Sequence, residues 1–156
     1  MTPAFHIFRR HLPHWRLEGA TYFVTWRLMR GQPVLCGAER TTVLQVICHF
    51  RGVRFFLGPH VVMDDHVHVI VRPNSSQTLS SILHSWKSFS AHTLQREHHR
   101  AGAVWLDESF DRIIRDEEDL LEKAAYILNN PRKRWPDVEQ YAWVGLGHGE
   151  CGGAAL

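Results

Sequence analysis

The chain has 156 residues, of which 44% are hydrophobic and 22% charged, with 7 Pro and 11 Gly. This length and composition favour one globular domain and exclude a long disordered chain, a collagen-like repeat and a coiled coil. The longest uncharged apolar run is too short to cross a bilayer, and no signal-peptide pattern follows Arg9 and Arg10. We therefore expect a cytoplasmic protein with no membrane partner.

Charge is distributed unevenly along the chain. Residues 1–100 contain 12 Lys and Arg against 5 Asp and Glu, a local +7, whereas residues 101–156 contain 6 against 11, a local −5. Fifteen of the 18 basic residues are Arg, whose planar guanidinium pairs with phosphate and stacks on bases. The basic part favours a polyanionic partner, although a solvated basic surface has the same composition. The first candidates for contact with a nucleic acid are Arg9, Arg10, Arg16 and Arg72.

The first half of the chain predicts a strand, a helix and a hairpin. Residues 22–28 alternate apolar and polar side chains with period two, which is typical of a strand. Residues 38–51 repeat apolar side chains at spacings of three and four, which predicts a helix that Gly52 ends. Two strand-like runs, 55–63 and 66–72, are separated only by Asp64-Asp65, so we expect an antiparallel hairpin.

The second half predicts a long helix over 78–100, a short strand over 110–115 and a final helix from 117 to about 130, before Pro131. The order β-α-β-β-α-β matches the ferredoxin-like α+β fold, a four-stranded antiparallel sheet with two helices on one face. An additional C-terminal helix follows, and the other face of the sheet is expected to be free for function. We interpret residues 1–156 as one domain with a core of about 9–143 and a Gly-rich tail over 144–156.

The predicted strand 66–72 carries a His-x-His pair. Period-two geometry places its valines on one face, toward the core, and His66, His68 and Arg72 on the other. Two imidazoles at i and i+2, roughly 7 Å apart at their Cα atoms, can converge on one metal ion. Arg72 lies further along the same face, where it can meet a phosphate. Because the chain has 12 His, such a pair also arises by chance, and two structural histidines are the alternative.

The final helix places a tyrosine on its polar side. At about 100° per residue, the apolar residues of 120–128 form one continuous arc and Tyr126 projects almost directly opposite. Asn130 lies at i+4, one turn away on the same side. A core tyrosine would point the other way, which leaves a half-exposed surface tyrosine as the alternative. A phenol and an amide oxygen together are what a nucleophile and a third metal ligand require.

Several segments resemble the HUH single-tyrosine transposases. Residues 63–70 resemble their His-apolar-His signature, Trp105 with residues 110–116 resembles the segment that follows, and residues 125–131 resemble their tyrosine helix, which ends in Asn-Pro. Residues 10–14 and 22–28 resemble the start of the REP-associated tyrosine transposases, a domesticated bacterial branch. The likeness covers roughly residues 9–143, and His-x-His about 60 residues before Tyr-(x)3-Asn-Pro is a specific combination.

The resemblance implies an enzyme that cleaves and rejoins single-stranded DNA, acting on hairpins of repeated extragenic palindromes (REP). It implies that His66, His68 and Asn130 hold Mg²⁺ or Mn²⁺. Tyr126 would then attack the scissile phosphodiester, leaving a 5′-phosphotyrosine and a free 3′-hydroxyl.

Imidazole ligands by themselves suit Zn²⁺ or Mn²⁺ better than Mg²⁺. The resemblance also implies a bacterial cytoplasmic protein that is a monomer rather than a dimer. Asp64 departs from the pattern, because relatives usually have Pro before the His pair.

Two other functions are compatible with parts of the pattern. A non-catalytic RNA-recognition-like module would bind nucleic acid on the free sheet face, but such modules stack bases on aromatic side chains, whereas the strand 66–72 offers His66, His68 and Arg72. A metal-dependent phosphoesterase that activates water would need the His pair but not Tyr126. No Walker loop, GxSxG, GxGxxG or HExxH motif is present in the sequence.

Overall fold

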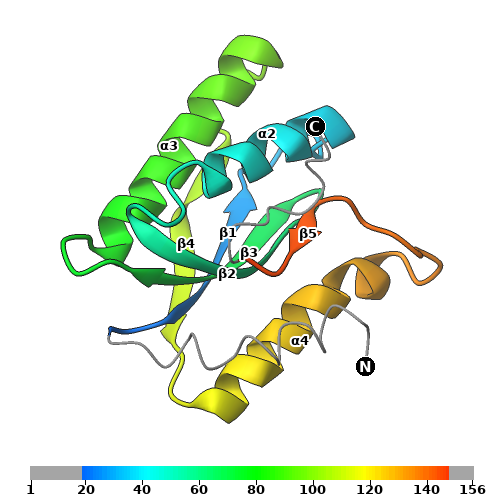
Figure 1. Ribbon diagram of the computed structural model, residues 1–156. Helices are drawn as coiled ribbons and strands as arrows, with labels where there is room; N and C mark the ends of the chain where they lie inside the picture. Colours follow the sequence, from blue (N-terminus) through cyan, green and yellow to red (C-terminus); the bar gives the residue numbers. More distant parts are fainter. Residues whose placement is uncertain (1–18, 148–156) are drawn as a thin grey trace.

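The structure is a computed structural model that describes residues 19–147, so Arg9, Arg10 and Arg16 lie outside the described residues. Its helices and strands, labelled as in Figure 1, are β1 (Tyr22–Leu28), α2 (Gly37–Cys48), β2 (Phe55–Val62), β3 (His66–Pro73), α3 (Leu79–Glu97), β4 (Trp105–Ile113), α4 (Glu117–Arg134) and β5 (Val144–Gly145).

The strands of the described region form one five-stranded antiparallel sheet in the order β4-β1-β3-β2-β5. This arrangement confirms the predicted β-α-β-β-α-β topology and adds the two-residue β5 beside β2. Thr25 in the middle of β1 faces His68 of β3 on one side and Phe110 of β4 on the other. The register therefore places one residue from each of three strands in a single row across the sheet.

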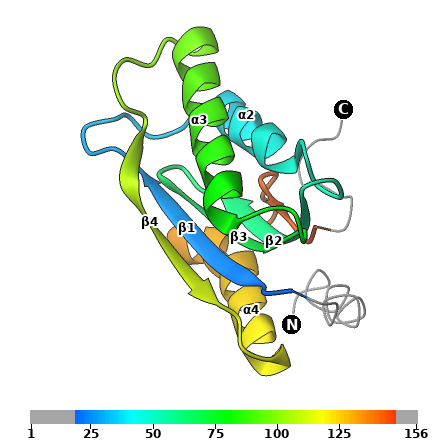
Figure 2. The same ribbon diagram turned by 90° about the vertical axis from the view of Figure 1, so that its left-hand side faces the viewer.

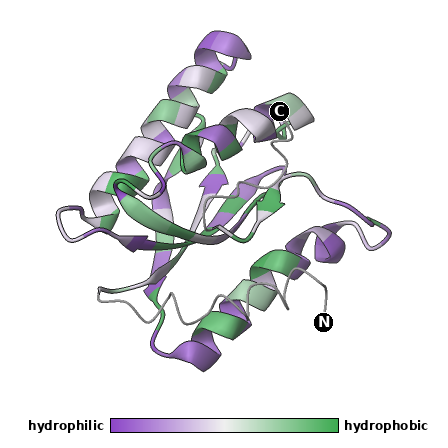
Figure 3. Cartoon of the chain, viewed as in Figure 1, coloured by the Kyte–Doolittle hydropathy of each residue, from purple (hydrophilic) through white to green (hydrophobic). Residues whose placement is uncertain are grey.

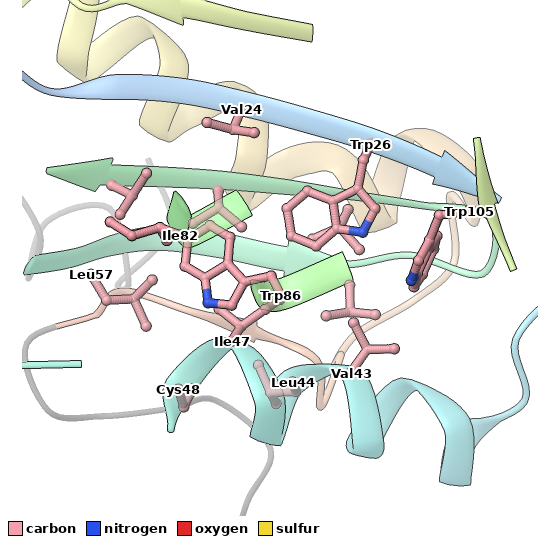
Figure 4. Close-up of a cluster of buried hydrophobic side chains, with 14 of the residues drawn as sticks. Val24, Trp26, Val43, Leu44, Ile47, Cys48, Leu57, Ile82, Trp86 and Trp105 are labelled. Carbon is pink, nitrogen blue, oxygen red and sulfur yellow. The ribbon is translucent and has the colours of Figure 1, made fainter. Parts of the chain in front are cut away.

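Helices α2 and α3 cover one face of the sheet, as predicted (Figures 1 and 2). Trp26 from β1 stacks on Trp86 of α3 with ring centroids 5.7 Å apart, and both are buried. Trp105 at the start of β4 is also buried, and its indole N–H donates to Ser90 Oγ at 2.9 Å. Figure 4 shows these indoles together with the aliphatic side chains of α2. The three tryptophans therefore serve the core rather than a binding surface.

Helix α4 packs on the opposite face, so the expectation that this whole face is free is wrong (Figures 1 and 2). Leu120, Ala124 and Ile127 are buried against Phe23 of β1 and Ile70 of β3. The apolar arc of α4 has the period of a helix that covers a sheet, and burying it removes apolar area from water. This second, smaller core thus seats α4 beside β2 and β3, and the polar side of the helix faces side chains of β1 and β4.

The ends of α4 follow from its charges. Asp116 caps the helix by accepting a hydrogen bond from the backbone N–H of Asp119 at 2.8 Å, and acidic residues occupy the first turn. The helix does not end at Asn130: it runs through Pro131 to Arg134, since a proline in the last turn removes only one hydrogen bond and the basic residues 132–134 suit the helix C-terminus. Both ends of α4 are hydrophilic in Figure 3.

Other boundaries also differ from the prediction. Strand β4 begins at Trp105 rather than at residue 110, because its first half is paired with β1 although it is rich in polar residues. Helix α2 ends at Cys48 and α3 at Glu97, each about a turn or less before the predicted end. Within residues 19–147 no helix has the length and the apolar character that a membrane span needs.

Candidate active site

A cleft of about 660 Å³ lies between α4 and the strands β1, β3 and β4. Tyr126 and Asn130 of α4 line it, and so does His68 of β3. The structure therefore brings together the polar side of α4 and the predicted His face of β3. The remaining lining includes Phe23, Thr25, Arg27, Phe110, Arg112, Lys123 and Lys133.

The two imidazoles are oriented by their Nδ1 atoms. The rings of His66 and His68 have centroids 4.6 Å apart. His66 Nδ1 lies 2.6 Å from Asp65 Oδ1, and His68 Nδ1 lies 2.7 Å from Thr25 Oγ1. When each Nδ1–H donates to these oxygens, each Nε2 carries the lone pair. Partners of this kind fix the tautomer and the ring orientation of metal-binding histidines.

The Nε2 atoms face the space beside α4. His66 Nε2 lies 3.2 Å from Asn130 Oδ1, and Asn130 is buried. His68 Nε2 is buried and has no hydrogen-bond partner among the described residues. A buried nitrogen without a partner is costly unless a ligand satisfies it. The spacing of 3.2 Å resembles that of adjacent ligands of a six-coordinate ion, about 3 Å when each bond is about 2.1 Å.

The protonation states of His68 and Asp65 favour the binding of a cation at the site. Burial lowers the pKa of His68 to about 3, and neighbouring positive charges act in the same direction, so this imidazole is neutral at neutral pH. Burial alone would raise the pKa of Asp65, but its hydrogen bond to His66 lowers it, so this carboxylate is ionised. No group of three or more His, Cys, Asp or Glu side chains in residues 19–147 could hold a metal ion. Asn130 Oδ1 is the neutral oxygen that lies beside His66 Nε2.

Tyr126 projects from the polar side of α4, as the sequence predicts, and its side chain is 44% exposed. Its ring centroid lies 5.3 Å from that of His68 and 6.1 Å from that of Phe23, both edge-on. Lys133 Nζ lies 5.7 Å from the Tyr126 ring centroid. The Tyr126 ring thus lies beside the His68 imidazole, with Lys133 over its face, and it lines the open cleft.

Cations surround the cleft. Arg27 and Lys133 are exposed at its wall, and Lys123 lies 6.0 Å from the ring of Phe23. Arg112 also lines it, with one guanidinium nitrogen 3.0 Å from Asp119 Oδ1. The one acidic lining residue within the described chain is Glu122. An anionic chain such as a phosphodiester backbone is therefore favoured here.

Arg72 has a different position from the one its strand face suggests. It is buried, its guanidinium lies 5.0 Å from the Phe56 ring centroid, and it is absent from the lining of the cleft. Arg72 lies at the end of β3 away from the His pair and is paired with Phe56 of β2. Burial lowers the pKa of the Arg72 guanidinium. The described residues thus bring His66, His68, Asn130 and Tyr126 together and leave Arg72 outside.

Several site residues were missed by sequence reasoning. Thr25 and Phe110 lie in segments that resemble the family but were assigned no role, and strand register brings them into the site. Lys133 enters it through the extra turn of α4. Asp64, the departure from the family pattern, accepts a hydrogen bond from Arg134 at 2.9 Å. This pair ties the β2–β3 turn to the C-terminal end of α4, close to the site.

Comparison with known families now gives the class of protein. A family model described as "Transposase IS200 like" matches residues 19–130, and the chain belongs to this family. It is therefore a transposase, a member of an enzyme class that cleaves DNA. None of the curated proteins compared with the chain matches it.

Two solved structures share the fold. One is a REP-associated tyrosine transposase bound to a REP hairpin, 22% identical, with a TM-score of 0.68 over 82% of this chain and 77% of that chain. The other is a protein of Deinococcus radiodurans assigned as a transposase, 20% identical, with a TM-score of 0.51 over 72% of this chain and 92% of that chain. At these identities the likeness establishes the α+β fold, a five-stranded antiparallel sheet with helices on both faces.

Proposed function

We propose that this transposase cleaves and rejoins single-stranded DNA through a covalent bond to Tyr126. The observation that carries the proposal is the convergence of the Tyr126 phenol, two imidazole Nε2 atoms and the Asn130 amide oxygen beside one cationic cleft. A phenol on a rigid helix next to a phosphate-binding site is positioned for nucleophilic attack.

The proposed step exchanges one phosphoester bond for another. The Tyr126 oxygen bonds to phosphorus while the bond from phosphorus to the 3′-oxygen breaks. The phenol gives up its proton to solvent, and the departing oxygen takes one up to become a 3′-hydroxyl. Because the 5′-phosphotyrosine bond conserves the energy of the broken bond, a later attack by a 3′-hydroxyl reseals the strand without ATP.

A divalent ion, Mg²⁺ or Mn²⁺, fits the donors at the site. His66 and His68 would hold it through Nε2, and Asn130 through Oδ1, with Asp65 and Thr25 orienting the imidazoles. A bound divalent ion polarises the phosphoryl oxygens and withdraws charge from the phosphorus. Two imidazoles suit Mn²⁺ better than Mg²⁺, so the chain's own donors favour Mn²⁺ when both are offered.

Hairpins in single-stranded DNA are the proposed substrate. The similar transposase of known structure is bound to a REP hairpin, and the present chain has a cleft with exposed Arg27 and Lys133 that suits one DNA strand. The basic N-terminal residues Arg9, Arg10 and Arg16 are further proposed contacts to the DNA. Arg72 is the weakest of the predicted contacts, because it is buried away from the cleft.

The polarity of cleavage tests this function. Single-stranded hairpin DNA, labelled at its 5′ end or its 3′ end, is incubated with the protein and Mn²⁺ or Mg²⁺, then denatured in SDS. We expect the 3′-labelled fragment to migrate with the protein and the 5′-labelled fragment to be extended by a polymerase, because it ends in a hydroxyl. Protein bound to the 5′-labelled fragment, or no covalent species, would overturn the proposal.

A further inference from the structure

Phe110 is an aromatic side chain that is not part of either hydrophobic core. It lies in β4, lines the same cleft as Tyr126 and is 57% exposed. Among the described residues, its ring meets only that of Phe23, edge-on and with 6.5 Å between the centroids. Exposing a large apolar ring to water brings no gain in stability, so a ring that faces a binding cleft is a candidate for contact with a ligand.

The sheet register sets where Phe110 stands relative to the reacting groups. Phe110 pairs with Thr25, and Thr25 pairs with His68, so all three lie in one row on the face that α4 partly covers. Neighbouring strands are about 4.8 Å apart, which places Phe110 roughly 10 Å from His68 along this row. Phe23 lies between the rings, 6.5 Å from Phe110 and 6.1 Å from Tyr126. Phe110 is thus close to the reacting phenol but separate from it.

Cations stand on both sides of this ring. Arg112 follows two residues later on the same face of β4, and Arg27 follows two residues after Thr25 on β1, and both line the cleft. An exposed aromatic face between two guanidinium groups offers a base a surface for stacking and offers its flanking phosphates opposite charges. Arrangements of this kind bind single strands with little sequence preference.

We propose that Phe110 stacks on one unpaired base next to the scissile phosphate and so sets which phosphate reaches Tyr126. This inference rests on the proposed function. It makes Phe110 a positioning residue, since its ring contacts the substrate but not the reacting atoms. The sheet thus offers one stacking aromatic beside the imidazoles, on β4 rather than on the central strands.

The test is a double-mutant cycle for binding, in which one change is made in the protein and the other removes one base from the DNA. DNA hairpins that fix the register and carry a single-stranded flank of about ten nucleotides, each with an abasic residue at a different position of the flank, are titrated against wild type and Phe110→Ala without divalent metal. We expect one position at which loss of the base weakens wild-type binding about tenfold. At that position Phe110→Ala should bind the abasic and the intact strands equally, because the two changes remove the same contact.

Two variants separate stacking from other roles of the side chain. Phe110→Trp should restore binding and sensitivity to the abasic residue, whereas Phe110→Leu should not, because leucine keeps apolar area but has no ring face. Ile113→Ala is the matched control: Ile113 is also in β4 and 51% exposed, but it pairs with Tyr22, which packs against the core on the other face. This control should bind like wild type.

Cleavage mapping distinguishes the inference from the proposed function. Wild type should cut hairpin DNA at one phosphate, and Phe110→Ala should spread the cuts over neighbouring phosphates. Additive losses at every position, or full rescue by Phe110→Leu, would overturn the stacking role even when wild type cleaves as proposed. A wild type that never cleaves but shows the coupled position would retain the stacking site and overturn the proposed function.

Discussion

His66 Nε2 and Asn130 Oδ1 lie 3.2 Å apart, although 64 positions separate the two residues in the chain. With His66 Nδ1–H donated to Asp65, both facing atoms carry lone pairs, and a shared cation would make this arrangement favourable. The relationship joins the predicted His strand to the predicted tyrosine helix. Asn130 is buried although it lies on the polar side of α4, where it lines the cleft.

The proposed metal ligands give the first prediction. His66→Ala or His68→Ala should abolish cleavage while hairpin binding stays within a few fold, because cationic residues rather than the ion provide the affinity. Asn130→Ala should be milder, since water can replace a neutral ligand. Gel assays of cleavage and of binding measure the two effects. Full cleavage by both histidine variants in the presence of a chelator would contradict the metal role.

Thr25 gives a prediction about orientation. Thr25→Val keeps the shape of the side chain but removes the oxygen that faces His68 Nδ1, so it should raise the metal concentration needed for half-maximal cleavage by about 10–100-fold. DNA binding should not change. Thr42→Val is the matched control, because Thr42, on α2, has its Oγ1 3.1 Å from Nε2 of His98, the residue that follows α3. Equal effects of the two variants would mean that the loss is one of stability alone.

Salt dependence tests the cationic cleft. Each phosphate that the protein neutralises on a single strand contributes a slope of about −0.7 in log K against log salt. Lys133→Ala, next to Tyr126, should therefore weaken binding and reduce the slope by about 0.7. Arg96→Ala removes an exposed cation from α3, on the other face, and should leave the slope unchanged. An affinity of wild type that is flat with salt would contradict a phosphate-binding cleft.

Much of this site follows from local patterns, and the rest depends on long-range register. Period two placed His66 and His68 on one face, and helical period placed Tyr126 opposite the apolar arc, because both patterns are local. Thr25 and Phe110 could not be predicted, since pairing between distant strands brings them beside His68. Lys133 was missed because Pro131 predicts a helix end, whereas α4 continues for another turn.

The period of a strand did not predict that Arg72 lies outside the cleft. Its side of β3 is the side of His66 and His68, but the face is not uniform: one end is cleft and the other packs beside Phe56. Which end is open depends on where α4 lies, and no local pattern indicates that. The packing of α4 is also why only part of the face that was expected to be free is exposed.

A buried ion pair far from the cleft predicts the response of stability to acid. The hydrogen bond from Arg100 lowers the pKa of Glu39 from 4.5 to about 2, and both side chains are buried. A depressed folded-state pKa stabilises the fold above the unfolded value and loses that effect as pH falls through the folded one. Stability should therefore drop by about 3 kcal/mol between pH of about 4.5 and about 2.

Urea unfolding at several pH values measures this drop. Glu39→Gln should be less stable than wild type at neutral pH, because it leaves the Arg100 guanidinium buried without a counter-charge. The difference between the two proteins should shrink as pH falls. A constant difference from neutral pH to about pH 2 would show that Glu39 does not titrate as described.

Identification of the nucleophile tests most directly whether Tyr126 forms the covalent bond to DNA. Wild type and Tyr126→Phe are incubated with a single-stranded library of hairpins and Mn²⁺, and protease digestion followed by mass spectrometry locates any attached nucleotide. We expect the wild-type adduct on Tyr126, and from Tyr126→Phe neither an adduct nor cleavage, with DNA binding retained. Cleavage by Tyr126→Phe at the same phosphate, with a water-derived 5′-phosphate, would contradict the role of Tyr126 as the nucleophile and favour a water-activating phosphoesterase.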